Sequence, residues 1–387
     1  MKIFVPRESS TNETRIAVST DTIKKLVGYG FEVYFEKAAG NASGMPDQVL
    51  KDAGAKLATT KSPGEADVVL KVQRPTLTEV KKYKSGALVL ALMDPHGNEA
   101  DVMAMAKAGI SAFAMEFMPR ITRAQVMDVL SSQANLAGYQ AVIEGAAQFD
   151  RAMPMMMTAA GTVPAAKVFV MGAGVAGLQA IATARRLGAI VTATDVRPAA
   201  KEQVESLGAK FVAVEDDEFK QAETTGGYAK EMSKEYQAKQ AELVASHIAK
   251  QDIVITTALI PGRPAPKLVS KEMVSSMASG SVLVDLAVER GGNVVGAKVG
   301  EVVRTKNGVS IVGHANMPGR IASSASLLYA KNLLAFLETM IDKENGGMSV
   351  DWEDELVSAT LLTRDGKVVH PNFVALGKET KSAKNGG

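Results

Sequence analysis

Three glycines in the middle of the chain, Gly172, Gly174 and Gly177, have the spacing of a turn that binds phosphate groups. The apolar residues 168–171 before them predict a β-strand, and the residues after them predict a helix that ends at Gly188. Gly172 would permit the tight turn, Gly174 would leave room for a pyrophosphate, and Gly177 would let the helix pack closely on the sheet. The free N–H groups and the positive dipole end of that helix would then face the phosphates.

An acidic residue, Asp195, ends the next apolar run at residues 190–193. A carboxylate about 20 residues beyond the turn can accept hydrogen bonds from adenosine ribose hydroxyls, so the complete pattern predicts a dinucleotide site. A plain βαβ turn is the alternative. Because a 2′-phosphate beside Asp195 would bring like charges together, the pattern favours NAD over NADP. Arg197 leaves that choice open, since it could meet a 2′-phosphate; we interpret it as a partner of adenine or phosphate.

Composition limits the class of protein. The chain has 387 residues, enough for two domains, and its 46% hydrophobic and 22% charged residues are typical of a soluble globular protein. A net charge of +2 and 5% aromatic residues give no support for nucleic-acid binding. The absence of cysteine excludes a disulfide, a thiolate nucleophile and a cysteine-ligated metal, and we expect no metal site. No apolar run approaches the ~18 residues that cross a bilayer, so we expect no membrane insertion.

Helix-ending glycines followed directly by a predicted strand occur in both halves of the chain, as is typical of doubly wound α/β sheets. We therefore predict two Rossmann-like α/β domains. The first, residues 1–125, is discontinuous and completed by residues 320–387, and the second spans residues 126–319. We expect strands in the first at residues 2–6, 32–36, 67–72, 87–93 and 111–117. The six strands of the second are expected at 168–171, 190–193, 210–214, 252–257, 281–286 and 309–313. Long helices at 125–150 and 323–341 would join the domains.

Several polar segments lie at predicted strand or domain edges. Residues 119–133, 256–262 and 285–293 each have an explanation as helix caps or turns, but together they favour a cleft. The polar segment 216–239 is either a solvated loop or a mobile lid. Three consecutive methionines, Met155 to Met157, are interpreted as filling a core or loop rather than as a metal or partner site.

The segments MPRITRAQVMDVLSSQANLAGY, MTAAGTVPAAKVFVMGAGVAGLQAIATARRLGA, GGYAKEM, TTALIPGRPAPKL and VDLAVERGGN resemble the NAD(H)-binding domain of proton-translocating, Re/Si-specific NAD(P) transhydrogenases. The resemblance extends over essentially the whole chain. It implies hydride transfer from NADH to NADP⁺ held on a partner domain, coupled to proton translocation by membrane-spanning subunits. It also implies a homodimer at the cytoplasmic face of a bacterial inner membrane.

The resemblance also implies roles for particular residues. It assigns the reacting nicotinamide to Arg120, Gln125 and Asp128. It implies that the NAD contacts are Arg120, Thr122, Arg123, Gln125, Asp128, Ser131, Gly172, Gly174, Val175, Gly177, Asp195, Val196, Arg197, Gly227, Gln240 and Leu259. Tyr228 corresponds to a tyrosine on a mobile loop that closes over the nucleotide, which favours the lid interpretation.

Alanine dehydrogenase, a relative of the same fold, is the alternative function. Arg15 and Lys71 occupy the positions of its substrate binders, but the position of its catalytic histidine falls on Ala91 or Leu92, and His96 is out of register. An amino-acid dehydrogenase needs a positioned general acid or base, which this sequence lacks at the usual place. An NAD-sensing module without turnover is a third interpretation.

Overall fold

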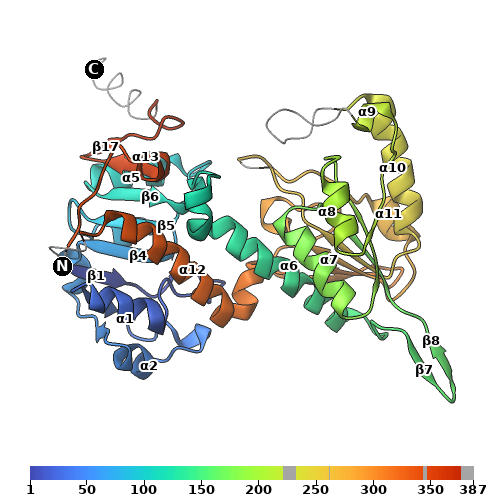
Figure 1. The fold of residues 1–387 in the computed structure, drawn as a ribbon, viewed down its shortest axis with the longest axis horizontal. Coiled ribbons are helices and arrows are strands. Elements are labelled where there is room, and N and C mark those ends of the chain that lie inside the picture. Colours follow the sequence, from blue (N-terminus) through green and yellow to red (C-terminus); the bar gives the residue numbers. More distant parts are fainter. Residues whose placement is uncertain (221–231, 261, 343–346, 376–387) are drawn as a thin grey trace. The chain divides into compact units, whose positions relative to one another are not determined.

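The structure is a computed structural model that describes residues 1–220, 232–260, 262–342 and 347–375. The chain divides into two compact units (Figure 1), here called unit 1 (Met1–Gln133 with Gly319–Gly387) and unit 2 (Ala134–Pro318). The division falls later than the expected residue 125, because Ser132 and Gln133 hydrogen-bond to Asn332 and Ala325 in unit 1. None of the helices in the described part of the chain is long and apolar enough to cross a membrane.

Unit 1 contains an eight-stranded sheet with the order β17-β16-β6-β5-β4-β1-β2-β3. Its parallel strands are β1 (Lys2–Val5), β2 (Glu32–Phe35), β3 (Lys56–Leu57), β4 (Val68–Gln73), β5 (Leu88–Leu92) and β6 (Ser111–Ala114). The C-terminal strands β16 (Leu361–Arg364) and β17 (Lys367–Val368) add antiparallel pairs at the β6 edge. The end of the chain thus pairs with the last strand of the N-terminal segment.

Helices cover both faces of this sheet, and alternate strand residues point to opposite sides. Ile3 and Val5 belong to one apolar core, whereas Phe4 belongs to the other. The first core is closed by α1 (Thr20–Gly28), α2 (Asp47–Asp52), α12 (Ala322–Leu337) and α13 (Glu355–Thr360). The second is closed by residues of α4 (Leu77–Val80) and α5 (Glu99–Lys107). A short α3 (Ser62–Glu65) precedes β4. Burial on both faces explains why these strands read as nearly continuous apolar runs.

Unit 2 contains a seven-stranded sheet with the order β11-β10-β9-β12-β13-β15-β14. Its strands are β9 (Lys167–Met171), β10 (Ile190–Thr194), β11 (Lys210–Phe211), β12 (Ile253–Thr256), β13 (Val282–Asp285), β14 (Val302–Arg304) and β15 (Ser310–Val312). The six predicted strands are present, and β14 is an additional antiparallel edge strand. Helix α6 (Val129–Gln148) begins in unit 1 and continues in unit 2 from Ala134. The other helices of unit 2 are α7 (Val175–Arg186), α8 (Ala200–Ser206), α9 (Asp217–Lys220), α10 (Lys234–Ile248) and α11 (Lys271–Ser276). The predicted Rossmann-like fold class is confirmed.

In both sheets the strand order reverses beside the first strand of the unit. Counted along each unit, the parallel strands run 3-2-1-4-5-6, so the reversal lies between β1 and β4 in unit 1 and between β9 and β12 in unit 2. Ligands of open α/β sheets bind beyond the carboxyl ends of the strands at such a reversal.

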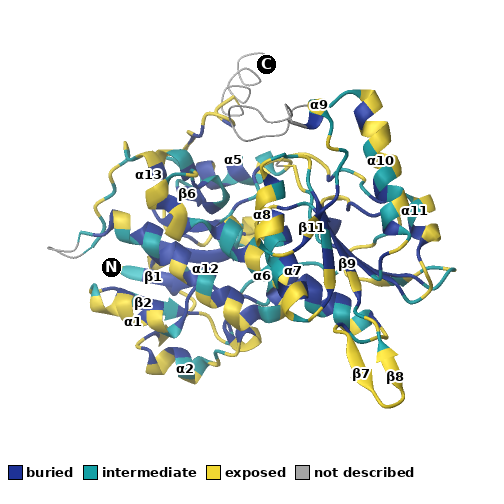
Figure 2. Ribbon diagram, turned by 45° about the vertical axis from the view of Figure 1, so that its right-hand side comes forward, coloured by how far each residue is buried: buried dark blue, intermediate teal, exposed yellow. Residues whose placement is uncertain are grey.

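A two-stranded hairpin, β7 (Met156–Thr158) and β8 (Gly161–Val163), extends from unit 2 and is exposed along its length (Figures 1 and 2). Its strands pair only with each other. Met155, Met156 and Met157 are 60%, 44% and 76% exposed, so of the two alternatives in the interpretation, filling a core or a loop, the core alternative is wrong. A cluster of exposed methionines is typical of a contact surface rather than of a core.

Helices α6 and α7 approach each other more closely than side chains permit at one position. A Cβ added to Gly138 on α6 would lie 2.0 Å from the Ala176 carbonyl oxygen on α7.

We expect Gly138→Ala to lower the free energy of unfolding by about 1–3 kcal/mol, because the helices must separate. Urea denaturation measures this. A Cβ on Gly28 in α1 meets nothing within 4 Å, so Gly28→Ala is the matched control and should leave stability unchanged or higher. Equal losses in both variants would contradict the close packing.

Candidate functional site

The turn between β9 and α7 has the geometry that the glycine pattern predicts. Gly172 has a φ of 107°, and a Cβ on Gly177 would lie 1.8 Å from the Gly172 carbonyl oxygen. Gly174 differs from both, because its φ is −74° and an added Cβ would meet nothing within 4 Å. Gly172 and Gly177 are thus required by the fold, whereas Gly174 faces open space at the N-terminus of α7. Since Gly174 has no side chain to cap the helix, the N–H groups of the first turn are left to solvent or a ligand.

Asp195 follows β10 and is held by two partners. Its Oδ2 accepts a hydrogen bond from the Ala173 N–H at 2.7 Å, which ties the end of β10 to the glycine turn. Arg197 donates to Oδ1 from its backbone N–H and its Nε, both at 2.9 Å, and to Oδ2 from Nη2 at 3.1 Å. Ribose hydroxyls would therefore compete with Arg197 for the carboxylate oxygens. The pairing also neutralises Asp195, so the like-charge argument against a 2′-phosphate is weaker than the sequence suggests.

Three of the predicted contact residues in unit 2 are exposed and apolar. Val175, Val196 and Leu259 are 41%, 64% and 54% exposed, and they follow β9, β10 and β12 at the carboxyl edge of the sheet. Such side chains suit the faces of planar rings. Gln240 on α10 accepts from the Val214 N–H at 2.8 Å and donates to Thr194 Oγ1 at 3.3 Å, beside the end of β10. Gly227 and Tyr228 lie outside the described residues. Of the predicted lid segment, residues 216–239, the structure describes the two ends, which contain α9 and the start of α10.

Two of the polar segments predicted to line a cleft, residues 256–262 and 285–293, lie in unit 2, and side chains from them mainly hold the loops after β12 and β13 in place. Asn293 is fully buried and exchanges hydrogen bonds with both backbone groups of Ala258 at 3.1 and 2.9 Å. Asp285 accepts from the N–H groups of Ala287 and Val294, both at 2.9 Å. Thr257 was not predicted as a site residue, and it donates to the Gly172 carbonyl at 3.2 Å. The sequence feature that could have predicted this role is the position of the Thr257 hydroxyl, directly after β12, the strand that pairs with β9.

In unit 1, residues 120–128 form a loop, so the expected long helix of residues 125–150 begins four residues later than predicted. The 3₁₀ helix η3 (Thr122–Met127) comes first, and α6 begins only at Val129. Asp128 ends the loop because its carboxylate accepts from the Ser131 N–H at 2.9 Å and from Ser131 Oγ at 2.6 Å. Asp128 and Ser131 thus cap α6, which is a structural role beside the predicted nicotinamide contact.

Residues 120–128 are anchored to the core of unit 1 by some side chains and expose others. Ala124 and Met127 are buried in the core of unit 1, and Asn332 on α12 donates to the Val126 carbonyl at 2.8 Å. The side chains of Arg120, Thr122 and Gln125 are exposed. Arg123 has a partner within the unit, since its guanidinium forms two hydrogen bonds with Asp354 at 2.8 and 3.1 Å. A nucleotide contact by Arg123 would have to compete with that ion pair.

Comparison with known proteins identifies the family. The model described as "Alanine dehydrogenase/PNT, N-terminal domain" matches residues 4–137, and the one described as "Alanine dehydrogenase/PNT, C-terminal domain" matches residues 141–371. The chain belongs to the alanine dehydrogenase/PNT family. The predicted membership is confirmed.

Relatives within the alanine dehydrogenase/PNT family group the chain with transhydrogenase alpha subunits. It is 55% identical to an NAD(P) transhydrogenase subunit alpha chain of Rhodospirillum rubrum, over 97% of this chain and 100% of that one. It is 29% identical to alanine dehydrogenase of Halomonas elongata, over 96% of this chain and 95% of that one. A crystal structure of transhydrogenase from Sinorhizobium meliloti is 63% identical, covers 95% of this chain and 100% of its own, and superposes with a TM-score of 0.88. The chain is thus an oxidoreductase component.

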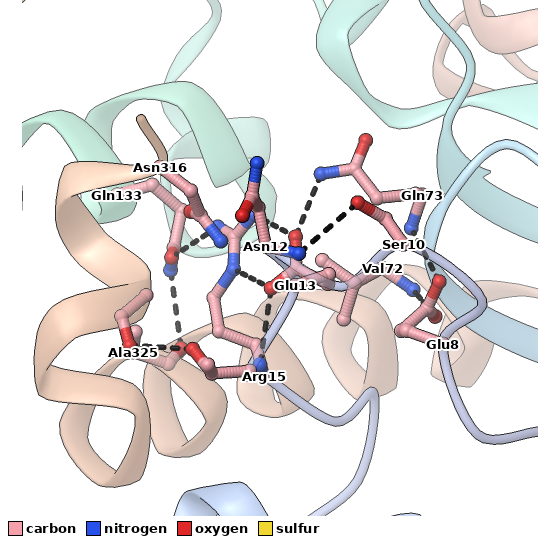
Figure 3. Close-up of polar contacts among 12 residues, drawn as sticks. Glu8, Ser10, Asn12, Glu13, Arg15, Val72, Gln73, Gln133, Asn316 and Ala325 are labelled. Atoms are coloured by element: carbon pink, nitrogen blue, oxygen red, sulfur yellow. Dashed lines mark hydrogen bonds and ion pairs between the residues drawn. The ribbon is translucent and has the colours of Figure 1, made fainter. Parts of the chain in front are cut away.

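The family also contains alanine dehydrogenases, so the environment of Arg15 and Lys71 decides whether a substrate carboxylate could bind there. Both are buried in unit 1. Arg15 donates from Nε and Nη2 to the Glu13 carboxylate at 2.8 and 2.7 Å and from Nη1 to Gln133 at 2.8 Å (Figure 3). Lys71 Nζ lies 3.2 Å from Glu8 and 2.9 Å from Glu79. Internal carboxylates therefore hold both cations.

Charge and burial act in opposite directions on the Glu13 carboxyl. Burial acts to raise its pKa, but hydrogen bonds and the charge of Arg15 outweigh burial and hold the pKa below its usual value of 4.5. An internal carboxylate of this kind is a strong competitor for any external one. His96, the nearest candidate for a catalytic histidine, packs instead on Phe373 with ring centroids 4.9 Å apart.

We expect Glu13→Gln to destabilise the chain by about 3–5 kcal/mol at pH 7, because it leaves the buried Arg15 charge without a carboxylate. The folded-state pKa of Glu13 is lowered, so its contribution is full above pH 4.5 and is lost as the pH falls through the folded value. The difference from the unsubstituted chain should shrink below pH 4.5. Urea denaturation at pH 7 and pH 4 tests this. Glu65→Gln, in an exposed pair with Lys2, is the control and should leave stability nearly unchanged.

Proposed function

We propose that this chain is the NAD(H)-binding component of a Re/Si-specific NAD(P)⁺ transhydrogenase. In that enzyme, hydride passes from NADH to NADP⁺ held on a partner domain, and membrane subunits couple the transfer to proton translocation. The observation that carries the proposal is the turn at Gly174, where open space meets a helix N-terminus beside the carboxylate of Asp195. The relatives named NAD(P) transhydrogenase subunit alpha give the reaction class.

We propose that unit 2 is the nucleotide-binding domain. The N–H groups at the start of α7 would hold the pyrophosphate, and Asp195 with Arg197 would bind the adenosine ribose. The exposed side chains of Val196 and Leu259, with Val175, would contact the planar rings. Gly227, Tyr228 and Gln240 complete the proposed contacts by resemblance. NAD(H) supplies the hydride when it is bound.

The loop at residues 120–128, with the first turn of α6, is the proposed positioning element for the nicotinamide. Arg120 and Gln125 are exposed polar groups on a loop whose backbone is anchored by Ala124, Met127 and Asn332, so the backbone that carries them is held in place. A hydride passes directly between two nicotinamides, and no proton-transferring side chain is needed on this chain. The task of Arg120, Gln125 and Asp128 is therefore orientation and exclusion of water. Thr122, Arg123 and Ser131 are proposed as supporting contacts.

The partners follow from the same proposal. The chain would act with an NADP-binding domain and membrane-spanning subunits, on the cytoplasmic face of the inner membrane. A homodimer is also proposed. The exposed methionines of the β7–β8 hairpin support a protein contact, because a pair of strands with an apolar, uncovered surface is typical of an interface.

Alanine dehydrogenase activity is the weaker alternative. Arg15 and Lys71 are paired with Glu13, Glu8 and Glu79, which leaves no uncompensated cation for a substrate carboxylate. An NAD sensor without turnover shares the nucleotide site, and hydride transfer to an NADP-binding partner distinguishes it from a transhydrogenase component.

The turn predicts a substitution that separates binding from folding. Gly174→Ala should lower NADH affinity by at least about tenfold, because its Cβ would occupy the space through which a pyrophosphate reaches the helix N-terminus. Its unfolding free energy should change little, since φ is negative and no protein atom is near. Calorimetric titration with NADH and urea denaturation measure the two quantities. Unchanged affinity in the folded variant would refute the pyrophosphate assignment.

The loop predicts a substitution that separates turnover from binding. Gln125→Ala should slow hydride transfer to a purified NADP-binding partner domain by about 10- to 100-fold, with much less change in NADH affinity. Rapid mixing of the two proteins gives the rate. Val126→Ala, at the exposed neighbouring position, is the control and should retain the rate. Asp128→Asn tests the charge at 128 while keeping a residue that caps helices well. If Gln125→Ala transfers hydride at the original rate, the proposed role of Gln125 in positioning the nicotinamide is wrong.

A further inference from the structure

Four N–H groups of unit 2 occupy the carboxylate of Asp195. Its Oδ1 accepts from the backbone N–H and from the Nε of Arg197, both at 2.9 Å. Its Oδ2 accepts from the Ala173 N–H at 2.7 Å and from Arg197 Nη2 at 3.1 Å. An ionised carboxylate offers about four lone-pair positions in all. Asp195 is therefore saturated by the chain itself, and a ribose hydroxyl must replace one of these donors.

The four donors differ in how easily they can leave. Two are backbone N–H groups, which could leave only if the glycine turn or the chain after β10 moved. The other two belong to the Arg197 guanidinium, which donates one hydrogen bond to each carboxylate oxygen in the parallel arrangement typical of arginine and carboxylate pairs. Rotation about side-chain bonds is enough to release both. The guanidinium is thus the group that a pair of ribose hydroxyls would replace.

The guanidinium also lies on the solvent side of the pair. The side chain of Arg197 is 35% exposed, whereas that of Asp195 is 8% exposed. A further contact, from Arg197 Nη2 to the Ala173 carbonyl, is long at 3.3 Å. An ion pair with one well-solvated partner contributes little net free energy. A ligand can therefore displace the guanidinium at a modest cost in affinity.

An alternative is that Arg197 stays on Asp195 and contacts adenine or a phosphate from there. In that arrangement the carboxylate remains saturated, and the ribose hydroxyls gain nothing from it. The two alternatives therefore differ in what happens to the hydroxyl contribution when the guanidinium is removed.

We propose that the Arg197 guanidinium is an internal competitor of the adenosine ribose, and that it sets how much affinity the ribose hydroxyls contribute. The inference rests on the proposed function, because it concerns the nucleotide site of unit 2. When the guanidinium leaves, the backbone N–H groups of Ala173 and Arg197 keep the carboxylate oriented, and the oxygens that it vacates accept from the 2′- and 3′-hydroxyls. Arg197 thus determines how strongly the site prefers a ribonucleotide over its deoxy analogue.

Displacement of bound NADH from the full chain by ADP and by 2′,3′-dideoxy-ADP tests the proposal. The two nucleotides share the base and the phosphates and differ only in the hydroxyls, so the ratio of their dissociation constants measures the hydroxyl contribution. We expect this ratio to be about five- to tenfold larger in Arg197→Met than in the unsubstituted chain, because methionine has no donor for Asp195. Adding Asp195→Ala to Arg197→Met should remove the increase.

Arg151→Met is the matched control. Arg151 pairs with Asp252, which directly precedes β12 and so lies at the opposite edge of the same sheet. This variant should leave the ratio unchanged. Arg197→Lys keeps the charge but lacks the planar fork, so its ratio should lie between those of the unsubstituted chain and Arg197→Met. Urea denaturation shows whether each variant is folded.

A larger ratio in Arg197→Met that disappears with Asp195→Ala supports internal competition. An equal or smaller ratio in Arg197→Met, or an increase that persists without the Asp195 carboxylate, would overturn it while leaving NADH binding, and so the proposed function, intact. An unsubstituted chain that does not bind NADH would overturn the proposed function and this inference together.

Discussion

The arrangement of unit 2 depends on the contact between the Gly172 carbonyl and Gly177. A strand and the helix that follows it approach so closely there that no Cβ fits. This contact fixes the direction of α7 relative to β9, and therefore the direction of the N–H groups at its start. The Ala173 N–H, within the same turn, holds Asp195 at the end of the neighbouring strand. One steric constraint thus brings a positive helix end and a carboxylate to the same edge of the sheet.

The constraint is local, which is why the sequence predicts it well. Strand, turn and helix lie within one continuous stretch, and each glycine has a physical reason visible from its spacing. The parallel strands of both units were predictable for a related reason: buried strands are apolar on both faces, and helices that end at glycine precede several of them. The main errors concern elements without such signals, such as the edge strand β14 and the exposed β7–β8 hairpin.

The surroundings of the predicted site residues could not be predicted from the sequence, because several of these side chains pair with another group of the same chain. Arg197 pairs with Asp195, Arg123 pairs with Asp354, and Asp128 caps α6 through Ser131. A sequence pattern indicates that a side chain can bind a ligand, but it does not reveal an internal group that competes for the same atoms. The competitor of Arg123 lies more than two hundred positions along the chain, and only the fold brings Asp354 beside it.

The two units share a strand order but differ in the residues that follow their first strand, at the point where that order reverses. In unit 2 the reversal has a glycine turn, an uncapped helix N-terminus and one carboxylate that an arginine neutralises. In unit 1 no glycine turn follows the first strand, and the residues after β1 are Pro6, Arg7 and Glu8. A pyrophosphate is attracted by free N–H groups at the start of a helix, which the turn of unit 2 presents. The residues after the first strand of each unit, rather than the shared topology, therefore distinguish the two units as candidate nucleotide sites.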